Sequence, residues 1–198
     1  MDKWNKNALD YGKNPIPSPK KTVSVTQDVL IKTRTLTQDV ETINAHLEND
    51  IRNSIFEQST AAKCLRTKWN MHEKFDSFKL LGNAVIEFAK RFNNNETDED
   101  GNHRDYSLRV DSSWGLIYKK DSYTDLHQHW PALWSYTYCV RSCPKCSPLV
   151  FPNAPLEIES KEGQVILFPS WVNHSVPKQE CDHDRIIVAG NLMMEKWI

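Results

Sequence analysis

The sequence contains neither a long apolar run nor an apolar N-terminal stretch. A membrane-spanning helix needs about 18 or more consecutive apolar residues, and none of the 198 residues starts such a run. The segment from Met1 to Asn7 is mostly polar and lacks the apolar core of a secretory signal peptide. We therefore expect a soluble, intracellular protein that has no membrane partner.

The sequence also lacks a strong charge bias and an even number of cysteines. The formal net charge is -1 and the isoelectric point is about 6.7, so no global charge signal favours nucleic acid or an anionic membrane as a partner. Five cysteines, an odd number, fit a reducing compartment better than a disulfide framework. Both observations agree with an intracellular location.

The length suits one domain that follows a polar arm. Residues 1–21 contain alternating prolines at Pro15, Pro17 and Pro19 and show no hydrophobic period, which predicts an extended arm that orders only on a protein partner. Residues 22–198 are expected to form a single domain, whose surface is well solvated because 26% of the residues are charged.

Two amphipathic helices are predicted in the first half of this domain. The first follows Thr37, a suitable N-cap, and the second spans 76–92, which gives helical support over about 37–92. Apolar residues recur every three to four positions in both segments. The two stripes consist of Val40, Ile43, Leu47, Ile51 and Ile55, and of Phe78, Leu81, Val85, Phe88 and Phe92.

Strand patterns dominate the second half. The segment 23–30 can form an early strand, and residues 93–102 are a polar, acidic loop without the ligand pattern of a calcium loop. From Tyr106 onward, short runs rich in Trp, Tyr, Val and Ile alternate with Pro and Gly, which is typical of strands. Helices followed by strands predict an α+β fold with a mainly β core over about 106–198, a small jelly roll braced by helices.

Three histidines have the spacing of a metal site. Residues two apart on an extended segment point to the same side, so His127 and His129 can converge on one ion with a third ligand from a neighbouring strand. His174 follows the run Phe168-Pro169-Ser170-Trp171 and is the candidate third ligand. Three protein groups on one face of a divalent metal leave the other positions open, which favours redox-active iron over zinc.

Arg185 adds a cation to this set. It opens the apolar run that ends near Asn191 and would therefore be buried. A guanidinium presents a rigid fork of donors that matches a carboxylate, so its simplest partner is a small dicarboxylate bound to the metal.

In these features the sequence resembles the iron(II)- and 2-oxoglutarate-dependent oxygenases, and within them a group with a His-x-His segment that is common in phages and marine bacteria. The resemblance covers roughly residues 70–198, and order, spacing and local context agree. The shared features are Trp114, His127-Gln128-His129, Ser135-Tyr136-Thr137-Tyr138, Phe168-Pro169-Ser170-Trp171 with His174, and Arg185 through Asn191.

The resemblance implies a double-stranded β-helix, Fe(II) and 2-oxoglutarate as cofactors, and O2 as co-substrate. His127 and His174 would bind iron, and Arg185 would hold the far carboxylate of 2-oxoglutarate. The wider superfamily carries Asp or Glu where this chain has His129; we favour His129 as the third ligand because the group resembled here also carries His-x-His. Asp125, on the same alternating face, is the alternative ligand. The implied location is the cytoplasm, or the host cytoplasm for a viral protein.

Three more residues are candidates for the co-substrate pocket. Tyr118 and Tyr138 lie on strands that should flank the site, where either hydroxyl could bond the co-substrate carboxylate. Asn191 falls on the same alternating face as Arg185 and is expected to face the pocket.

A second metal site is suggested by Cys143-Pro144-Lys145-Cys146 together with Cys181 and His183. These are zinc-type ligands in two separate segments. In the fold that the resemblance implies, the strand that ends near Val140 pairs with the strand that begins at Arg185, which would bring the four ligands together around a structural zinc.

The leading functional hypothesis is a dioxygenase that hydroxylates a substrate whose class the sequence leaves open. The alternative is a cupin-like metal-binding structural or interaction protein without turnover, for example a phage component. A third hypothesis, a zinc hydrolase with three histidine ligands, needs a general base near the metal, and Asp125 is the obvious candidate.

Overall fold

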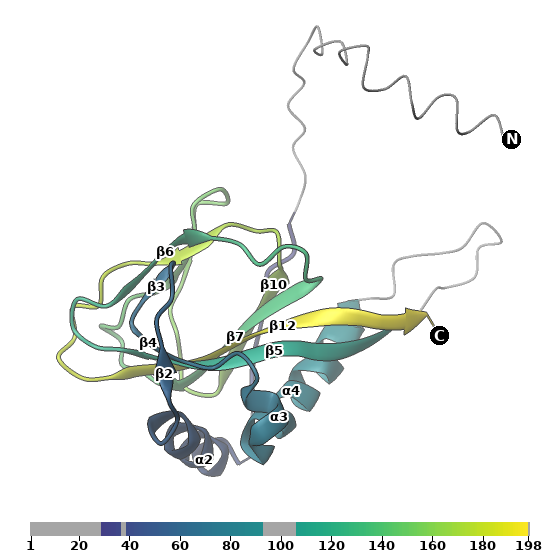
Figure 1. Ribbon diagram of the computed structural model, residues 1–198. Helices are drawn as coiled ribbons and strands as arrows, with labels where there is room; N and C mark the ends of the chain where they lie inside the picture. Colours follow the sequence, from purple (N-terminus) through teal and green to yellow (C-terminus); the bar gives the residue numbers. More distant parts are fainter. Residues whose placement is uncertain (1–28, 37–38, 93–105, 198) are drawn as a thin grey trace, which may run out of the picture.

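The computed structural model describes residues 29–36, 39–92 and 106–197. Two antiparallel sheets face each other (Figure 1). The large sheet has the strand order β1 (Lys32–Thr35), β10 (Gln164–Pro169), β7 (Trp134–Arg141), β12 (Arg185–Trp197), β5 (Tyr106–Tyr118), β4 (Leu65–Thr67) and β2 (Phe56–Glu57). The small sheet has the order β3 (Ala62–Lys63), β6 (Tyr123–His127), β11 (His174–Val176), β8 (Leu149–Phe151) and β9 (Leu156–Ile158).

The strands from β5 to β12 pass repeatedly from one sheet to the other. Strands β5, β7, β10 and β12 belong to the large sheet, and β6, β8, β9 and β11 to the small one. This arrangement is a double-stranded β-helix, so the predicted fold class is confirmed. The predicted pairing of the strand ending near Val140 with the one beginning at Arg185 is also present, because Ile186 lies opposite Arg141.

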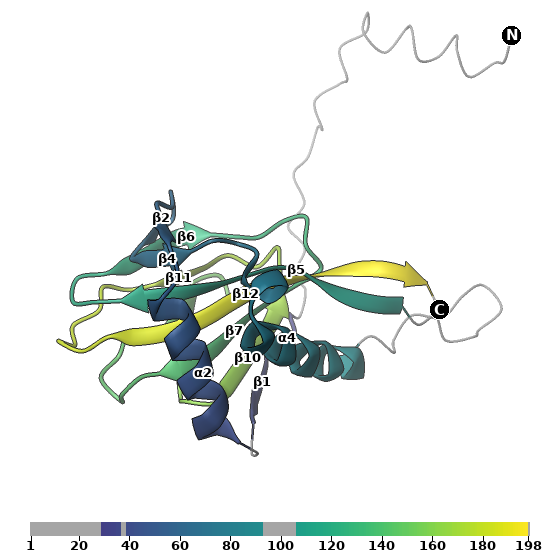
Figure 2. The same ribbon diagram turned by 60° about the horizontal axis from the view of Figure 1, so that its bottom comes forward.

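The helices cover the outer face of the large sheet (Figures 1 and 2). They are α2 (Val40–Arg52), α3 (Met71–Lys74), α4 (Asp76–Ala89) and the short 3-10 helix η1 (Lys90–Phe92). The predicted stripes supply this contact: Leu47 and Ile51 of α2 and Phe78 and Val85 of α4 are fully buried. Helix α2 can approach the sheet closely because strand β5 has Gly115 where a Cβ would meet Ile51.

Both faces of the large sheet are buried, and the alternation of β12 divides its side chains between them. Ile186 and Val188 belong to the core beneath the helices, whereas Ile187 and Ala189 belong to the core between the two sheets. Arg185 has the same parity as Ile187, so its side chain enters the space between the sheets. The candidate functional site lies in that space.

Several local predictions need correction. Of the predicted strand 23–30, residues 23–28 lie outside the described part, and Val29 and Leu30 are not in a strand; the strand found there, β1, begins at Lys32. Helix α2 ends at Arg52, so Ile55 lies beyond it and is 73% exposed.

Other predictions fall on residues that the structure does not describe. These are the arm 1–21, the cap at Thr37 and the acidic loop 93–102. The short strands β2, β3 and β4, which lie between α2 and α3, were not predicted from the sequence. No helix in the described segments is long and apolar enough to cross a membrane.

Candidate metal centre

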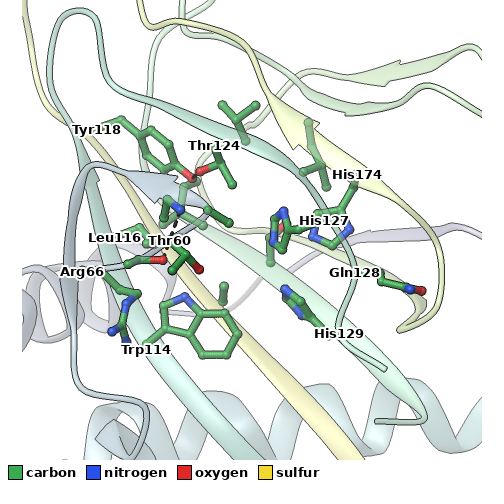
Figure 3. A pocket seen from close by; sticks show the side chains of 18 of the residues that line it. Thr60, Arg66, Trp114, Leu116, Tyr118, Thr124, His127, Gln128, His129 and His174 are labelled. Carbon is green, nitrogen blue, oxygen red and sulfur yellow. Dashed lines mark hydrogen bonds between the residues drawn. The ribbon is translucent and has the colours of Figure 1, made fainter. Parts of the chain in front are cut away.

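A cavity of about 270 Å³ lies between the two sheets. Its walls are mainly apolar and aromatic, with Trp114 and Leu116 from β5 and Ile187 and Ala189 from β12. Figure 3 shows three imidazoles gathered at one side of it, and the hydroxyls of Tyr118 and Thr124 at another. The predicted histidines and Arg185 all line this one cavity.

The three predicted histidines are brought together by strand pairing. His127, the last residue of β6, lies directly opposite His174, the first residue of β11. His129 follows two residues later, where its backbone N–H donates to the carbonyl of Ser170 at 2.7 Å. One ring nitrogen from each histidine lies within 4.8 Å of the other two, which is close enough for all three to bind one ion.

Hydrogen bonds fix the orientation of all three rings. The Nδ1 atom of His127 lies 2.8 Å from the backbone oxygen of Asp125, and that of His174 lies 2.9 Å from the oxygen of Val172. The Nδ1 atom of His129 lies 2.7 Å from Oδ1 of Asn191. An oxygen acceptor requires each Nδ1 to carry the proton, so each Nε2 keeps a free lone pair. This is the arrangement in which imidazole binds a metal.

Burial keeps these imidazoles neutral. It lowers the pKa of His127, it lowers the pKa of His129 to about 4, and it lowers the pKa of His174 to about 3; the neighbouring histidines add to the effect at His129 and His174. Because the folded-state pKa values lie below the ordinary value, all three rings are neutral imidazoles at neutral pH, with the single proton on Nδ1. Asp125, the alternative ligand, lies outside the group and is exposed, and its backbone oxygen accepts from His127.

Arg185 supplies a buried cation to the same cavity. Only 2% of its surface is exposed, and one Nη donates to Ser160 Oγ at 2.7 Å. Its Nε and its other Nη are buried without a partner, and no carboxylate of the described residues pairs with it. A buried guanidinium with two unused donors is costly in the free protein and suits a planar anion.

The two tyrosine candidates lie on opposite faces of the large sheet. The ring of Tyr118 lines the cavity, with the Arg185 guanidinium carbon 4.9 Å from its centroid and its hydroxyl 2.7 Å from Thr124 Oγ1. The prediction for Tyr138 is wrong, because it belongs to the core beneath the helices and donates to Asn44 Oδ1 at 2.7 Å. Thr137, one residue earlier, faces the cavity instead.

Asn191 does not line the cavity, but it contacts the outer nitrogen of His129, which does. Besides accepting from His129, its Oδ1 accepts from Ser135 Oγ at 2.9 Å, and its Nδ2 donates to Ser112 Oγ at 3.0 Å. Ser135 Oγ also lies 3.0 Å from Ser170 Oγ, whose hydroxyl can donate to it, so Ser170 extends the network. Sequence patterns gave no signal for these serines, because small polar residues on strands are common and the network forms only through strand register.

No protein-family profile matches the sequence, and no curated protein is significantly similar to it. Solved structures do match. A prolyl-4-hydroxylase from Pseudomonas putida has a TM-score of 0.61 at 13% identity, covering 83% of this chain and 92% of that one. A Trichoplax adhaerens prolyl hydroxylase, in complex with a hypoxia inducible factor peptide, has a TM-score of 0.61 at 16% identity and covers 83% of each chain.

A viral collagen prolyl hydroxylase from Paramecium Bursaria Chlorella virus-1, in complex with 2-oxoglutarate, has a TM-score of 0.57 at 14% identity. The match covers 82% of this chain and 94% of that one. The chain has the fold of the 2-oxoglutarate- and iron(II)-dependent oxygenases. At these identities the likeness establishes the fold, and the chemistry has to be argued from the side chains.

One charged residue of the cavity was not predicted from the sequence. Arg66, on β4, is 4% exposed and stacks over Trp69 with its guanidinium carbon 4.4 Å from the ring centroid. Its Nη atoms donate to the backbone oxygens of Thr67 and Gln58, and Glu57 lies 3.5 Å away. Unlike Arg185, Arg66 therefore has a carboxylate close to its charge. Arg66 was not predicted as a cavity residue because strand β4 is too short to show a sequence pattern.

Proposed function

We propose that the protein is a non-haem iron(II)- and 2-oxoglutarate-dependent dioxygenase that hydroxylates a bound substrate. Iron would be held by Nε2 of His127, His129 and His174, and the far carboxylate of 2-oxoglutarate by Arg185. The observation that carries the proposal is the presence, in one cavity, of three converging lone pairs and a buried guanidinium without a carboxylate partner. The His-x-His segment agrees with the phage and marine bacterial group that the sequence resembles.

The donor set fits an open metal site. Three neutral imidazoles leave the full charge of a divalent ion uncompensated, so an anionic chelator is favoured beside it. When bound, iron and 2-oxoglutarate supply the oxidising power, since 2-oxoglutarate is decarboxylated to succinate while O2 is consumed. Leu116, Ile187 and Ala189 give the cavity apolar walls, which disfavour water beside the bound co-substrate.

The same cavity argues against the hydrolase hypothesis. A zinc hydrolase needs a general base within reach of the metal-bound water. Neither Asp nor Glu is among the described residues that line the cavity, and Asp125 is exposed. The cupin-like alternative, metal binding without turnover, remains the rival that an experiment has to exclude.

The test uses the purified protein without oxygen. Addition of iron(II) and then 2-oxoglutarate is expected to give a weak visible charge-transfer band, because the keto acid chelates the ion. Admission of O2 should then remove the band and produce succinate. A band that persists after O2, with no succinate, would support metal binding without turnover, and iron binding without any band would overturn 2-oxoglutarate as the co-substrate. Zinc(II) in place of iron is the control, which should bind but give neither signal.

Asn191 is expected to act as a positioning residue for His129. Asn191→Ala removes the acceptor that fixes the ring, and loss of such a partner lowers metal affinity by about 10–100-fold. Anaerobic competition titration with iron(II) measures this.

A matched control for this substitution is Asn44→Ala. Asn44 is also a partly buried amide, but it bonds Val140 and Tyr138 beneath the helices. It should lower stability without changing iron affinity. Asn191→Asp keeps the acceptor oxygen and is expected to restore most of the affinity; equal affinity in the wild type and Asn191→Ala would refute the positioning role.

A further inference from the structure

A second group of metal-ligating side chains lies outside the cavity. Cys143 and Cys146 belong to the loop that leaves β7, and Cys181 and His183 to the segment that enters β12. Because Ile186 of β12 lies opposite Arg141 of β7, the strand register holds the two loops side by side. The four ligand atoms lie within 4.8 Å of one another.

The spacing of these atoms suits one tetrahedral ion. The Sγ atom of Cys143 lies 3.5 Å from that of Cys181 and 3.9 Å from that of Cys146, and Cys146 Sγ lies 3.8 Å from Nε2 of His183. Bonds of about 2.3 Å from zinc to sulfur place the sulfurs of a tetrahedral site about 3.8 Å apart. A disulfide needs about 2.0 Å between its sulfurs, and all the cysteines of the protein that the structure describes are free.

N–H groups surround the sulfurs as they would surround thiolates. The backbone N–H of Cys143 donates to Cys146 Sγ at 3.3 Å, and that of Lys145 donates to Cys143 Sγ at 3.4 Å. The side-chain amide of Gln179, which is 1% exposed, donates to Cys146 Sγ at 3.3 Å. A neutral thiol is a weak acceptor, so three donors aimed at two sulfurs favour the deprotonated, metal-binding form.

The histidine of the group is also oriented for binding. Its Nδ1 lies 3.1 Å from the backbone oxygen of Asp184, which holds the proton on Nδ1 and leaves Nε2 of His183 to face Cys146. This is the outer hydrogen bond that metal-binding histidines ordinarily make.

We infer that Cys143, Cys146, Cys181 and His183 bind one zinc ion in a closed, four-coordinate site. All four tetrahedral positions are filled by protein, so the site is structural. It joins the loop after β7 to the segment that ends two residues before Arg185. The ion therefore fixes the entry of β12 and, with it, the backbone that carries the cavity guanidinium. The zinc site itself stands independently of the proposed oxygenase activity.

The experiment measures zinc per chain in the full-length protein, with His127→Ala as the background so that the histidine cluster does not contribute. About one tightly bound zinc per chain is expected in this background and also with Cys64→Ser, because Cys64 lies outside the group. Cys181→Ser should lose the zinc, and Cys181→His, which restores a ligand, should regain it. Replacement by cobalt(II) should give the strong visible bands of a tetrahedral site with thiolate ligands.

A further readout links the site to Arg185. In the protein with an intact histidine cluster, Cys181→Ser is expected to weaken 2-oxoglutarate binding several-fold. The cobalt spectrum is recorded in the same His127→Ala background and needs no change in the cysteine group, so the test survives a Cys181 variant that fails to fold. Zinc that is retained in Cys181→Ser, cobalt bands of an octahedral site, or a disulfide between Cys143 and Cys181 in the protein as purified would each overturn the inference. None of these outcomes depends on whether succinate is formed.

Discussion

Replacing Arg185 with methionine is expected to stabilise the free protein and to abolish 2-oxoglutarate binding. The guanidinium is 2% exposed, two of its nitrogens have no partner, and no carboxylate of the described residues balances its charge. Replacing a buried charged group with an apolar side chain of similar size is often stabilising, by about 1–4 kcal/mol. Functional residues commonly carry such a stability cost. Urea unfolding of the metal-free protein measures the change.

Ligand linkage supplies the second half of this prediction. With manganese(II) in place of iron, 2-oxoglutarate at about 100 times its Kd should stabilise the wild type by about 2.7 kcal/mol and Arg185→Met hardly at all. Arg185→Lys keeps the charge but loses the fork of donors, so it should bind more weakly than the wild type without the gain in stability.

Arg66→Met is the matched control. Arg66 is similarly buried in the same cavity and its Nε also lacks a partner, but both of its Nη atoms donate to backbone oxygens and Glu57 lies 3.5 Å from its charge. Its replacement should therefore destabilise the protein. If Arg185→Met also destabilised it and left 2-oxoglutarate binding unchanged, Arg185 would be a structural residue and the proposed co-substrate site would be wrong.

The contrast between Arg185 and Tyr138 shows which parts of the site can be read from the sequence. A charged residue at the start of an apolar strand predicts a position in a binding pocket, because burying a charge that has no function would cost too much stability. Strand β7 gives no such signal. Both of its faces are buried, one beneath the helices and one between the sheets, so Tyr138 and its neighbour Thr137 are equally compatible with a pocket position.

The helices and the two ligand clusters were predictable for a different reason. The stripes of α2 and α4 repeat over several turns, and His-x-His and Cys-x-x-Cys place ligands within one segment. Strands β2, β3 and β4 are two or three residues long, which is too short for any periodicity. Arg66 and its contacts with Trp69 therefore appear only in three dimensions.

His174→Ala is expected to abolish both iron binding and succinate formation. His174 is 4% exposed, lies opposite His127 in the strand pairing and is the one proposed ligand that comes from a separate segment. Its loss leaves two imidazoles from one segment, without a third donor across the cavity. The fall in iron affinity should exceed the about 10–100-fold expected from removing a hydrogen-bond partner such as Asn191. Anaerobic iron titration and a succinate assay measure the two effects.

A histidine outside the cavity gives the control. His72→Ala, on α3, also removes a partly buried imidazole whose pKa is lowered by burial, but His72 contributes nothing to the cavity. It should leave iron affinity and succinate formation unchanged.

His129→Asp tests the third position separately. A carboxylate can bind the ion but does not donate to Asn191, so the iron affinity of His129→Asp should lie between those of the wild type and His129→Ala. Succinate formation by His174→Ala at the wild-type rate would show that the three imidazoles do not act as one metal site.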